Sequence, residues 1–194
     1  MLLGFSKGER QSAGILSKRH NDIPYAGFRE RLTGGLQKLG LLGPTDTIDS
    51  HIREDEPDWA FGSLVRCTLA KGGKKSGTII PSSATADSYK SWREQCTSRY
   101  LSKLPTRLEV VVMLSNDDEY VEECRKRITE LHPATRPINP VAYGDERVTW
   151  VHIIHFGGQG FNHMNSWMTG ATNKAGRKGD WAVEAVQKGM QRNL

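Results

Sequence analysis

The sequence has few cysteines and no long apolar run, and each shortage excludes a class of protein. Its 194 residues include only three cysteines, Cys67, Cys96 and Cys124, and no Cys-x-x-Cys pair. An odd number of widely spaced cysteines indicates neither a disulfide framework nor a zinc site. No apolar run approaches the ~20 residues that span a bilayer, and the apolar start is too short for a signal peptide. We therefore expect a protein without membrane contact, cytoplasmic or, in a eukaryote, nuclear.

The charge balance is moderately basic. There are 27 Lys and Arg residues against 22 Asp and Glu residues, a net charge of +5 with a pI near 9.2. This excess fits a polyanionic partner without demonstrating one. The hydrophobic content of 37% and the mean hydropathy of −0.56 describe a polar chain that can still build a core. The length favours a single domain over residues 1–194.

Strand and helix signals alternate along the chain. Apolar runs predict strands at residues 1–3, 61–67, 109–114 and 150–154, and helical spacing predicts helices at residues 28–39, 87–103, 116–131 and 180–190. The alternation predicts an α/β fold of three layers, α/β/α, around a central, mainly parallel four-stranded sheet. The four strand carboxyl ends then meet at one edge. Because a strand opens at the first residue, we expect the natural chain to begin earlier.

The helix patterns also predict caps and buried faces. Ser115 or Asn116 is expected to cap the third helix, and Asp180 the last. Residues 133–140, with three prolines, are expected to be a loop, and residues 164–179 are polar and rich in Asn, Gly and Lys. The side chains predicted to face the core are Tyr89, Trp92, Cys96 and Tyr100 in the second helix, Tyr120, Cys124, Ile128 and Leu131 in the third, and Ala182, Ala185, Val186 and Met190 in the last.

The most distinctive stretch runs from Thr149 to His163. A nearly continuous apolar run ends in His155 and passes at once into a loop that contains three glycines. Such a run is typical of a strand buried on both faces. His155 would then lie at the carboxyl end of a buried strand, where open α/β sheets place their ligands. A surface histidine that follows a core strand is the alternative interpretation.

Five short motifs occur in an order that resembles the uracil-DNA glycosylase superfamily. The resemblance is closest to the iron–sulfur branches, although the N-terminal cysteine pair has no counterpart. Gly4–Gly8 is similar to the family's first active-site loop, and Ile23–Phe28 to the segment that leads into the first helix. Ser63–Cys67 is similar to a family strand that ends in a cysteine, and Cys96 with Tyr100-Leu101 and the strand ending at Ser115-Asn116 to the cysteine, helix and strand end that follow. His155 stands where the second active-site motif begins.

The resemblance implies a monofunctional DNA glycosylase that flips a damaged base, such as uracil, from single- or double-stranded DNA and hydrolyses its N-glycosidic bond. A histidine would stabilise the anion that develops on the departing base. The enzyme would be a monomer. The roles that the resemblance assigns are catalytic for Ser6, Glu9 and His155; substrate-binding for Gly4, Phe5, Tyr25, Ser63 and Asn116; and DNA-binding for Lys7, Gln159, Phe161, Met164, Lys174, Arg177 and Lys178.

Several positions depart from the family pattern. Either Ser6 or Phe5 stands where the family holds Asp, Glu or Asn. Ser6 can orient water but cannot act as a carboxylate base. Ser63 replaces the asparagine that reads the uracil edge. An iron–sulfur cluster needs four cysteines, and only Cys67 and Cys96 match. We therefore expect no cofactor.

Three alternatives stay open. The chain could be a catalytically weak or inactive member that binds nucleic acid or a protein through the same fold. It could also be another α/β enzyme, acting on a nucleotide or small molecule, whose site lies at the same sheet edge. A metal site of His152, His155 and His163 is disfavoured, because strand residues three apart point to opposite faces. No metal is expected.

Overall fold

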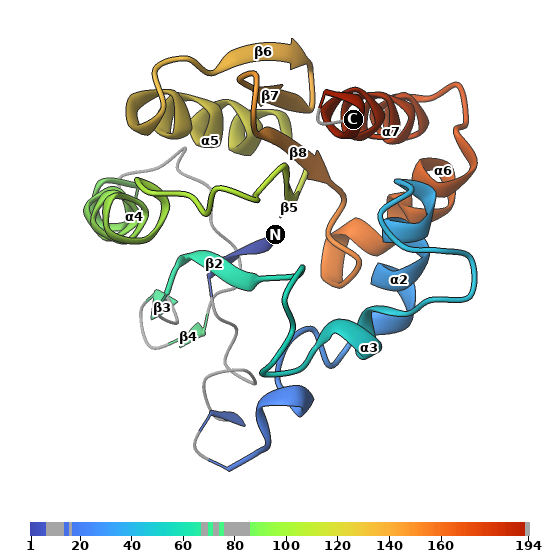
Figure 1. Cartoon of the computed structure of the whole chain (residues 1–194), viewed down its shortest axis with the longest axis horizontal. Coiled ribbons are helices and arrows are strands. Elements are labelled where there is room, and N and C mark those ends of the chain that lie inside the picture. Colours follow the sequence, from blue (N-terminus) through green and yellow to red (C-terminus); the bar gives the residue numbers. More distant parts are fainter. Residues whose placement is uncertain (7–13, 16, 67–69, 72–73, 76–85, 193–194) are drawn as a thin grey trace.

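A mixed, mostly parallel sheet of six strands runs through the middle of the molecule, with helices on both faces (Figure 1). The computed structural model describes residues 1–6, 14–15, 17–66, 70–71, 74–75 and 86–192. The strands of the sheet are β1 (Leu2–Ser6), β2 (Phe61–Val65), β5 (Val110–Leu114), β6 (Arg136–Asn139), β7 (Ala142–Gly144) and β8 (Thr149–Ile153). The helices are the 3-10 helices η1 (His20–Asp22) and η2 (Gly158–His163) and the α-helices α2 (Arg29–Lys38), α3 (Ile48–His51), α4 (Ala86–Leu101), α5 (Asp118–Leu131), α6 (Met164–Thr169) and α7 (Lys174–Gln191).

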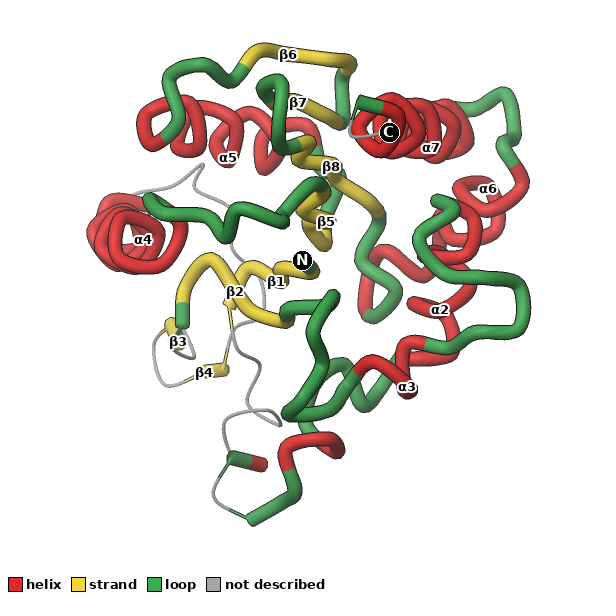
Figure 2. The backbone as a smooth tube through the Cα atoms, viewed as in Figure 1, coloured by secondary structure: helices red, strands yellow, loops and turns green. Residues whose placement is uncertain are grey.

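The strand order is β2-β1-β5-β8-β7-β6 (Figure 2). Strands β2, β1, β5 and β8 are parallel, whereas β7 and β6 are antiparallel to their neighbours. The predicted α/β class and the four parallel strands are confirmed. A separate two-stranded antiparallel ladder joins β3 (Ala70–Lys71) to β4 (Lys74–Lys75). It lies in the basic segment that connects β2 to α4.

The predicted strand count of four is wrong, because β6 and β7 form within and just after the segment expected to be a loop. β6 contains Pro137, which a sheet tolerates because β6 is an edge strand. β7 has only three residues, too few to show an alternating pattern. Pairing with β8, rather than local sequence, makes this segment a strand.

The two faces of the sheet carry separate apolar cores. Val110, Val112 and Leu114 of β5 pack on the side covered by α2, α3, α6 and α7. Val111 and Met113 point to the opposite side, covered by α4 and α5. Figure 1 shows these helix groups on either side of the sheet. β5 is therefore buried on both faces, as its continuous apolar sequence predicts.

The predicted buried stripe of α4 is wrong in part. Trp92 and Tyr100 are 53% and 44% exposed, whereas Thr97 and Leu101 are buried. Thr97 faces inward because its hydroxyl accepts a hydrogen bond from Arg127 Nε of α5, at 2.7 Å. A polar residue therefore occupies the helix face against α5, and the aromatic stripe lies toward solvent. The side chain of Tyr89 lies outside the described residues.

The last helix begins earlier than predicted. α7 starts at Lys174, and Asn173 caps it by accepting a hydrogen bond from the N–H of Gly176 at 2.9 Å. Asp180 lies inside the helix, and Met190 is 39% exposed. The predicted inward residues Ala182, Ala185 and Val186 are buried.

Two further boundaries differ from the sequence prediction. The cap of α5 is Asp117, whose carboxylate accepts from the N–H groups of Glu119 and Tyr120, instead of Ser115 or Asn116. The polar segment after His163, for which the sequence predicted no helix, forms α6 around the buried Trp167. Of the helices among the described residues, none combines the length and hydropathy needed to span a bilayer.

Candidate functional site at the carboxyl edge of the sheet

The carboxyl ends of the four parallel strands lie at one edge of the sheet. The chain leaves β1 toward β2 on one side and later returns to form β5 on the other. The strand order thus reverses between β1 and β5, which is where α/β sheets of this type bind their ligands. At this edge Gly4 pairs in register with Ser63, and Ser6 pairs with Val65. The predicted residues Gly4 and Ser63 are therefore neighbours, and Ser6 is half-buried at the end of β1.

His152 is a buried structural residue beneath this edge. Its Nδ1 lies 2.9 Å from the carbonyl oxygen of Ser115, and its Nε2 lies 3.1 Å from the hydroxyl of Tyr143. Burial lowers the pKa of His152 to about 4, so the ring is neutral at physiological pH. Nδ1–H donates to Ser115, and Nε2 accepts from Tyr143. The ring thus ties β8 to the end of β5.

His155 follows the end of β8 and is exposed. The N–H of Gly157 donates to its Nδ1 at 3.1 Å, and the carbonyl oxygen of Gly157 lies 2.9 Å from the same atom. Nδ1 can make only one of these two hydrogen bonds, because a ring nitrogen either carries a proton and donates or has a lone pair and accepts. When it accepts from the Gly157 N–H, the proton resides on Nε2. Among the described residues, none hydrogen-bonds that Nε2.

The ring of Phe28 lies 5.1 Å from the His155 ring, centroid to centroid. Tyr25 packs edge-on behind Phe28 at 5.7 Å and against Phe61 at 6.1 Å. The Tyr25 hydroxyl donates to the carbonyl oxygen of Leu2 at 3.3 Å, and burial raises its pKa. Tyr25, the predicted stacking aromatic, is thus inside the core. Phe28, which the sequence interpretation did not assign a role, is the aromatic ring beside His155, three residues further along the same motif.

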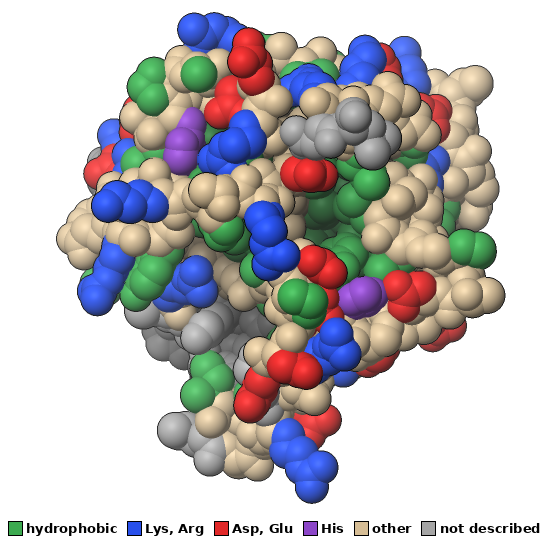
Figure 3. Space-filling view, in the orientation of Figure 1, with side chains coloured by type: hydrophobic (Ala, Val, Ile, Leu, Met, Phe, Trp, Pro, Cys, Tyr) green, Lys and Arg blue, Asp and Glu red, His purple; other side chains and the backbone are tan. Residues whose placement is uncertain are grey.

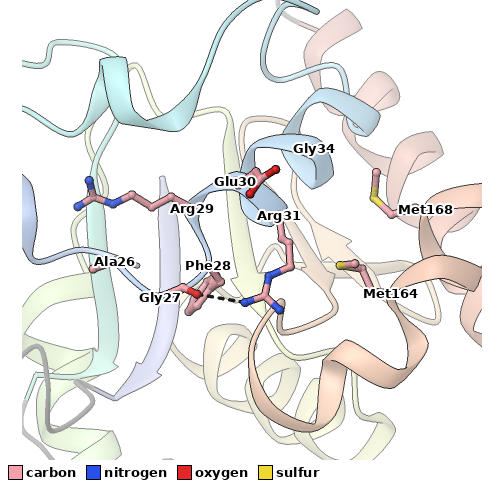
Figure 4. Close-up of a pocket in the computed structure, with 9 residues that line it drawn as sticks. All are labelled: Ala26, Gly27, Phe28, Arg29, Glu30, Arg31, Gly34, Met164 and Met168. Carbon is pink, nitrogen blue, oxygen red and sulfur yellow. Dashed lines mark hydrogen bonds between the residues drawn. The ribbon is translucent and has the colours of Figure 1, made fainter.

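A pocket of about 650 Å³ lies beside Phe28, which is one of its lining residues (Figure 4). In Figure 4 the side chains of Arg31 and Met164 reach toward each other, whereas Arg29 points away. Arg29 is held elsewhere, by Asp49 at 2.8 Å. The pocket is lined by Ala26, Gly27, Phe28, Arg29, Glu30, Arg31, Gly34, Met164 and Met168.

The loop after His155 is attached to α2 at two points. Phe156 is fully buried and packs edge-on against Trp167 at 5.8 Å. Its ring also lies against Gly35 of α2, where an added Cβ would come within 2.1 Å of Phe156 Cζ. The guanidinium of Arg31 lies 5.1 Å from the centroid of the exposed Phe161 ring and donates to the Gly27 carbonyl at 3.1 Å. Phe156 therefore anchors the loop that carries Phe161 and Met164.

The predicted DNA contacts on α7 divide into two kinds. Lys178 is only 7% exposed, and its ammonium donates to the Asn116 carbonyl and to Asp118, at 2.5 and 2.6 Å. Lys174 is exposed and binds the other oxygen of Asp118. Hydrogen bonds from Lys174 and Lys178 hold the pKa of Asp118 below its usual value. Lys178 thus connects α7 to α5 within the protein, whereas Lys174 and Arg177 remain at the surface.

The remaining predicted residues are less informative. Phe5 packs against Tyr120 at a centroid distance of 5.9 Å, on the α5 side of the sheet. Lys7, Glu9 and Cys67 lie outside the described residues, as does the side chain of Gln159. Within the described part of the chain, Cys96 and Cys124 are free thiols, and no cluster of His, Cys, Asp and Glu could hold a metal ion.

Charge on the face shown in Figure 3 is not uniform. Lys and Arg side chains predominate over the region of α4, and acidic and basic side chains are interleaved elsewhere.

The fold defines an α/β protein with a mixed, mostly parallel six-stranded sheet. Comparison with protein-family models, curated proteins and solved structures gave no match to this chain. The family resemblance therefore rests on the sequence motifs alone.

Proposed function

We propose that this protein is a DNA glycosylase-like hydrolase that cleaves the N-glycosidic bond of a flipped, deaminated base such as uracil. The observation that carries the proposal is the placement of His155. It follows the end of β8, at the edge where the strand order reverses, with its ring beside Phe28. A histidine and an aromatic ring at this edge are the two groups that such a site needs to hold a base and stabilise its departure.

His155 acts through Nε2. In the tautomer in which Nδ1 accepts from the Gly157 N–H, Nε2–H is a donor that has no hydrogen-bond partner among the described residues. Cleavage of the glycosidic bond leaves negative charge on the base, and a donor placed at that charge stabilises the transition state more than the bound substrate. Removing one such donor typically lowers kcat by about 100- to 1,000-fold.

The other groups bind and orient the substrate. Phe28 forms an aromatic wall next to His155, and Tyr25 supports Phe28 from behind. Gly4 and Ser63 are direct neighbours at this edge, since a Cβ added at Gly4 would lie 3.8 Å from Ser63 Oγ, an ordinary contact distance. Ser6, at the end of β1, is the hydroxyl that would orient the attacking water.

A second candidate is a binding module with the same fold and little catalysis. It is favoured by the two serines, since Ser6 supplies no carboxylate and Ser63 is too short for a two-point contact with a base edge. This module would bind nucleic acid through the same edge without releasing a base.

The test is a gel assay on oligonucleotides that contain uracil, hypoxanthine or xanthine, followed by alkali to cleave abasic sites. We expect cleavage by the wild-type chain and a loss of about 100-fold or more in His155→Gln. His163→Gln is the matched control, because His163 is also exposed and lies nearby in the chain, at the end of η2. Salt-sensitive binding without cleavage that Phe28→Ala weakens would favour the binding module at this edge. No DNA binding at low salt would contradict both.

A further inference from the structure

One flank of α4 exposes two large aromatic rings to solvent. Trp92 and Tyr100 are 53% and 44% exposed and stand eight residues apart on one helix, about 12 Å along its axis. Between them lies Cys96, which packs against Val65 of β2. The two rings therefore follow the flank of α4 that borders β2, the edge strand of the sheet.

Two cationic side chains lie beside the Tyr100 ring. The guanidinium of Arg66 lies 4.6 Å from the Tyr100 ring centroid, and that of Arg99 lies 5.6 Å from it. Lys90 is also exposed on α4. Arg93, in contrast, is tied to Glu123 of α5 at 3.4 Å. In Figure 3 basic side chains predominate over this part of the molecule.

We propose that this flank of α4 binds single-stranded nucleic acid, with Trp92 and Tyr100 as stacking rings and the neighbouring arginines as phosphate contacts. The combination of exposed aromatic rings with guanidinium groups is the chemistry that holds unpaired strands. A duplex fits less well, since its base faces are already stacked. The positive charge beside Tyr100 favours a polyanion over an apolar protein surface.

This surface is separate from the site at the carboxyl edge and does not depend on it. Its rings belong to α4 and one arginine to the end of β2, whereas His155 and Phe28 lie on the face covered by α2. The α4 flank binds an undamaged strand whether or not the chain cleaves a damaged one. Failure of the glycosylase assay therefore leaves the present proposal intact, and the converse also holds.

The test is fluorescence anisotropy with a labelled oligothymidylate of about 12 nucleotides, a length within the site sizes of single-strand binding folds. Trp92→Ala and Tyr100→Ala are each expected to weaken binding by about fivefold or more. Arg99→Ala should weaken binding and flatten its salt dependence. Oligouridylate and a duplex of the same length serve as the other two arms.

Two controls lie away from α4. Met190→Ala removes a comparably exposed apolar side chain from α7, and Arg107→Ala removes an exposed charge near Asp58. Both should bind as the wild type does. Arg99 is exposed, so Arg99→Ala remains informative if Trp92→Ala fails to fold.

Three results would overturn the proposal. The first is unchanged affinity in Tyr100→Ala and Arg99→Ala. The second is tighter binding of the duplex than of either single strand. The third is a wild-type dimer in gel filtration that Trp92→Ala converts to a monomer, because a second copy of the chain would then cover this flank.

Discussion

The Nδ1 atom of His152 donates to the carbonyl oxygen of Ser115 across 2.9 Å, and Ser115 has a backbone φ of 120°. The N–H of Ser115 in turn donates to the Ile153 carbonyl at 2.9 Å. The residue that follows β5 is therefore joined to the end of β8, at a point where a non-glycine backbone is strained. Strain of this kind persists only where surrounding contacts hold it.

Protonation of His152 should destabilise the fold in acid. Its pKa is about 4 in the folded protein against 6.5 in the unfolded chain, so the unfolded state binds more protons between these values. The free energy of unfolding should fall as pH decreases from about 6.5 to 4, by up to about 3 kcal/mol. Urea unfolding at a series of pH values measures this fall. It should flatten in His152→Gln, and His155→Gln should retain the wild-type slope.

The substitution Ser115→Gly should stabilise the protein. A φ of 120° is outside the regions that L side chains favour, and glycine adopts it without steric cost. We expect Ser115→Gly to raise the free energy of unfolding by about 1 kcal/mol, measured by urea unfolding. Ser115→Ala keeps the Cβ and should give no gain. Equal effects of the two substitutions would contradict the strain.

Gly35→Ala and Gly34→Ala should change the stability of the protein in opposite directions. A Cβ at Gly35 would come within 2.1 Å of Phe156, whereas a Cβ at Gly34 would meet only Met168 Cε at 3.6 Å. Gly35→Ala should cost about 1–3 kcal/mol through overpacking. Gly34→Ala should gain about 0.5–1 kcal/mol from helix propensity. Thermal unfolding of both variants compares them in one helix, and equal shifts in Tm would show that Phe156 can move aside.

The Lys178 ammonium should contribute more to stability than the Lys174 ammonium, although both bind Asp118. Lys178 is buried and donates also to the Asn116 carbonyl, whereas the side chain of Lys174 is 70% exposed. Lys178→Met leaves a partly buried carbonyl without its donor and should cost about 1–3 kcal/mol. Lys174→Met should cost under about 1 kcal/mol. A costlier change at Lys174 would indicate that Lys178 is not the link between α7 and α5.

The local sequence predicted those helices and strands whose hydrophobic pattern is recognisable without reference to a neighbouring strand or helix. The continuous apolar run that forms β5 and the helical spacing of Leu32 and Leu36 in α2 predict the observed structure, since both residues are buried. The order of these elements predicted the α/β class and the shared carboxyl edge. β6 and β7 are strands because β8 offers free hydrogen-bonding groups along its edge, which no local pattern records.

At the candidate site, too, the sequence predicted some features and only the tertiary structure revealed others. The sequence alone marked His155 as the residue after a buried strand, because an apolar run and a glycine loop flank it. Only the tertiary structure decided that Phe28, rather than Tyr25, lies beside that histidine, and that Lys178 is inside the protein. It also turned Thr97 inward and left Trp92 at the surface. Residue type and spacing fix which faces a helix or strand can bury, but packing against distant segments selects the face that becomes buried.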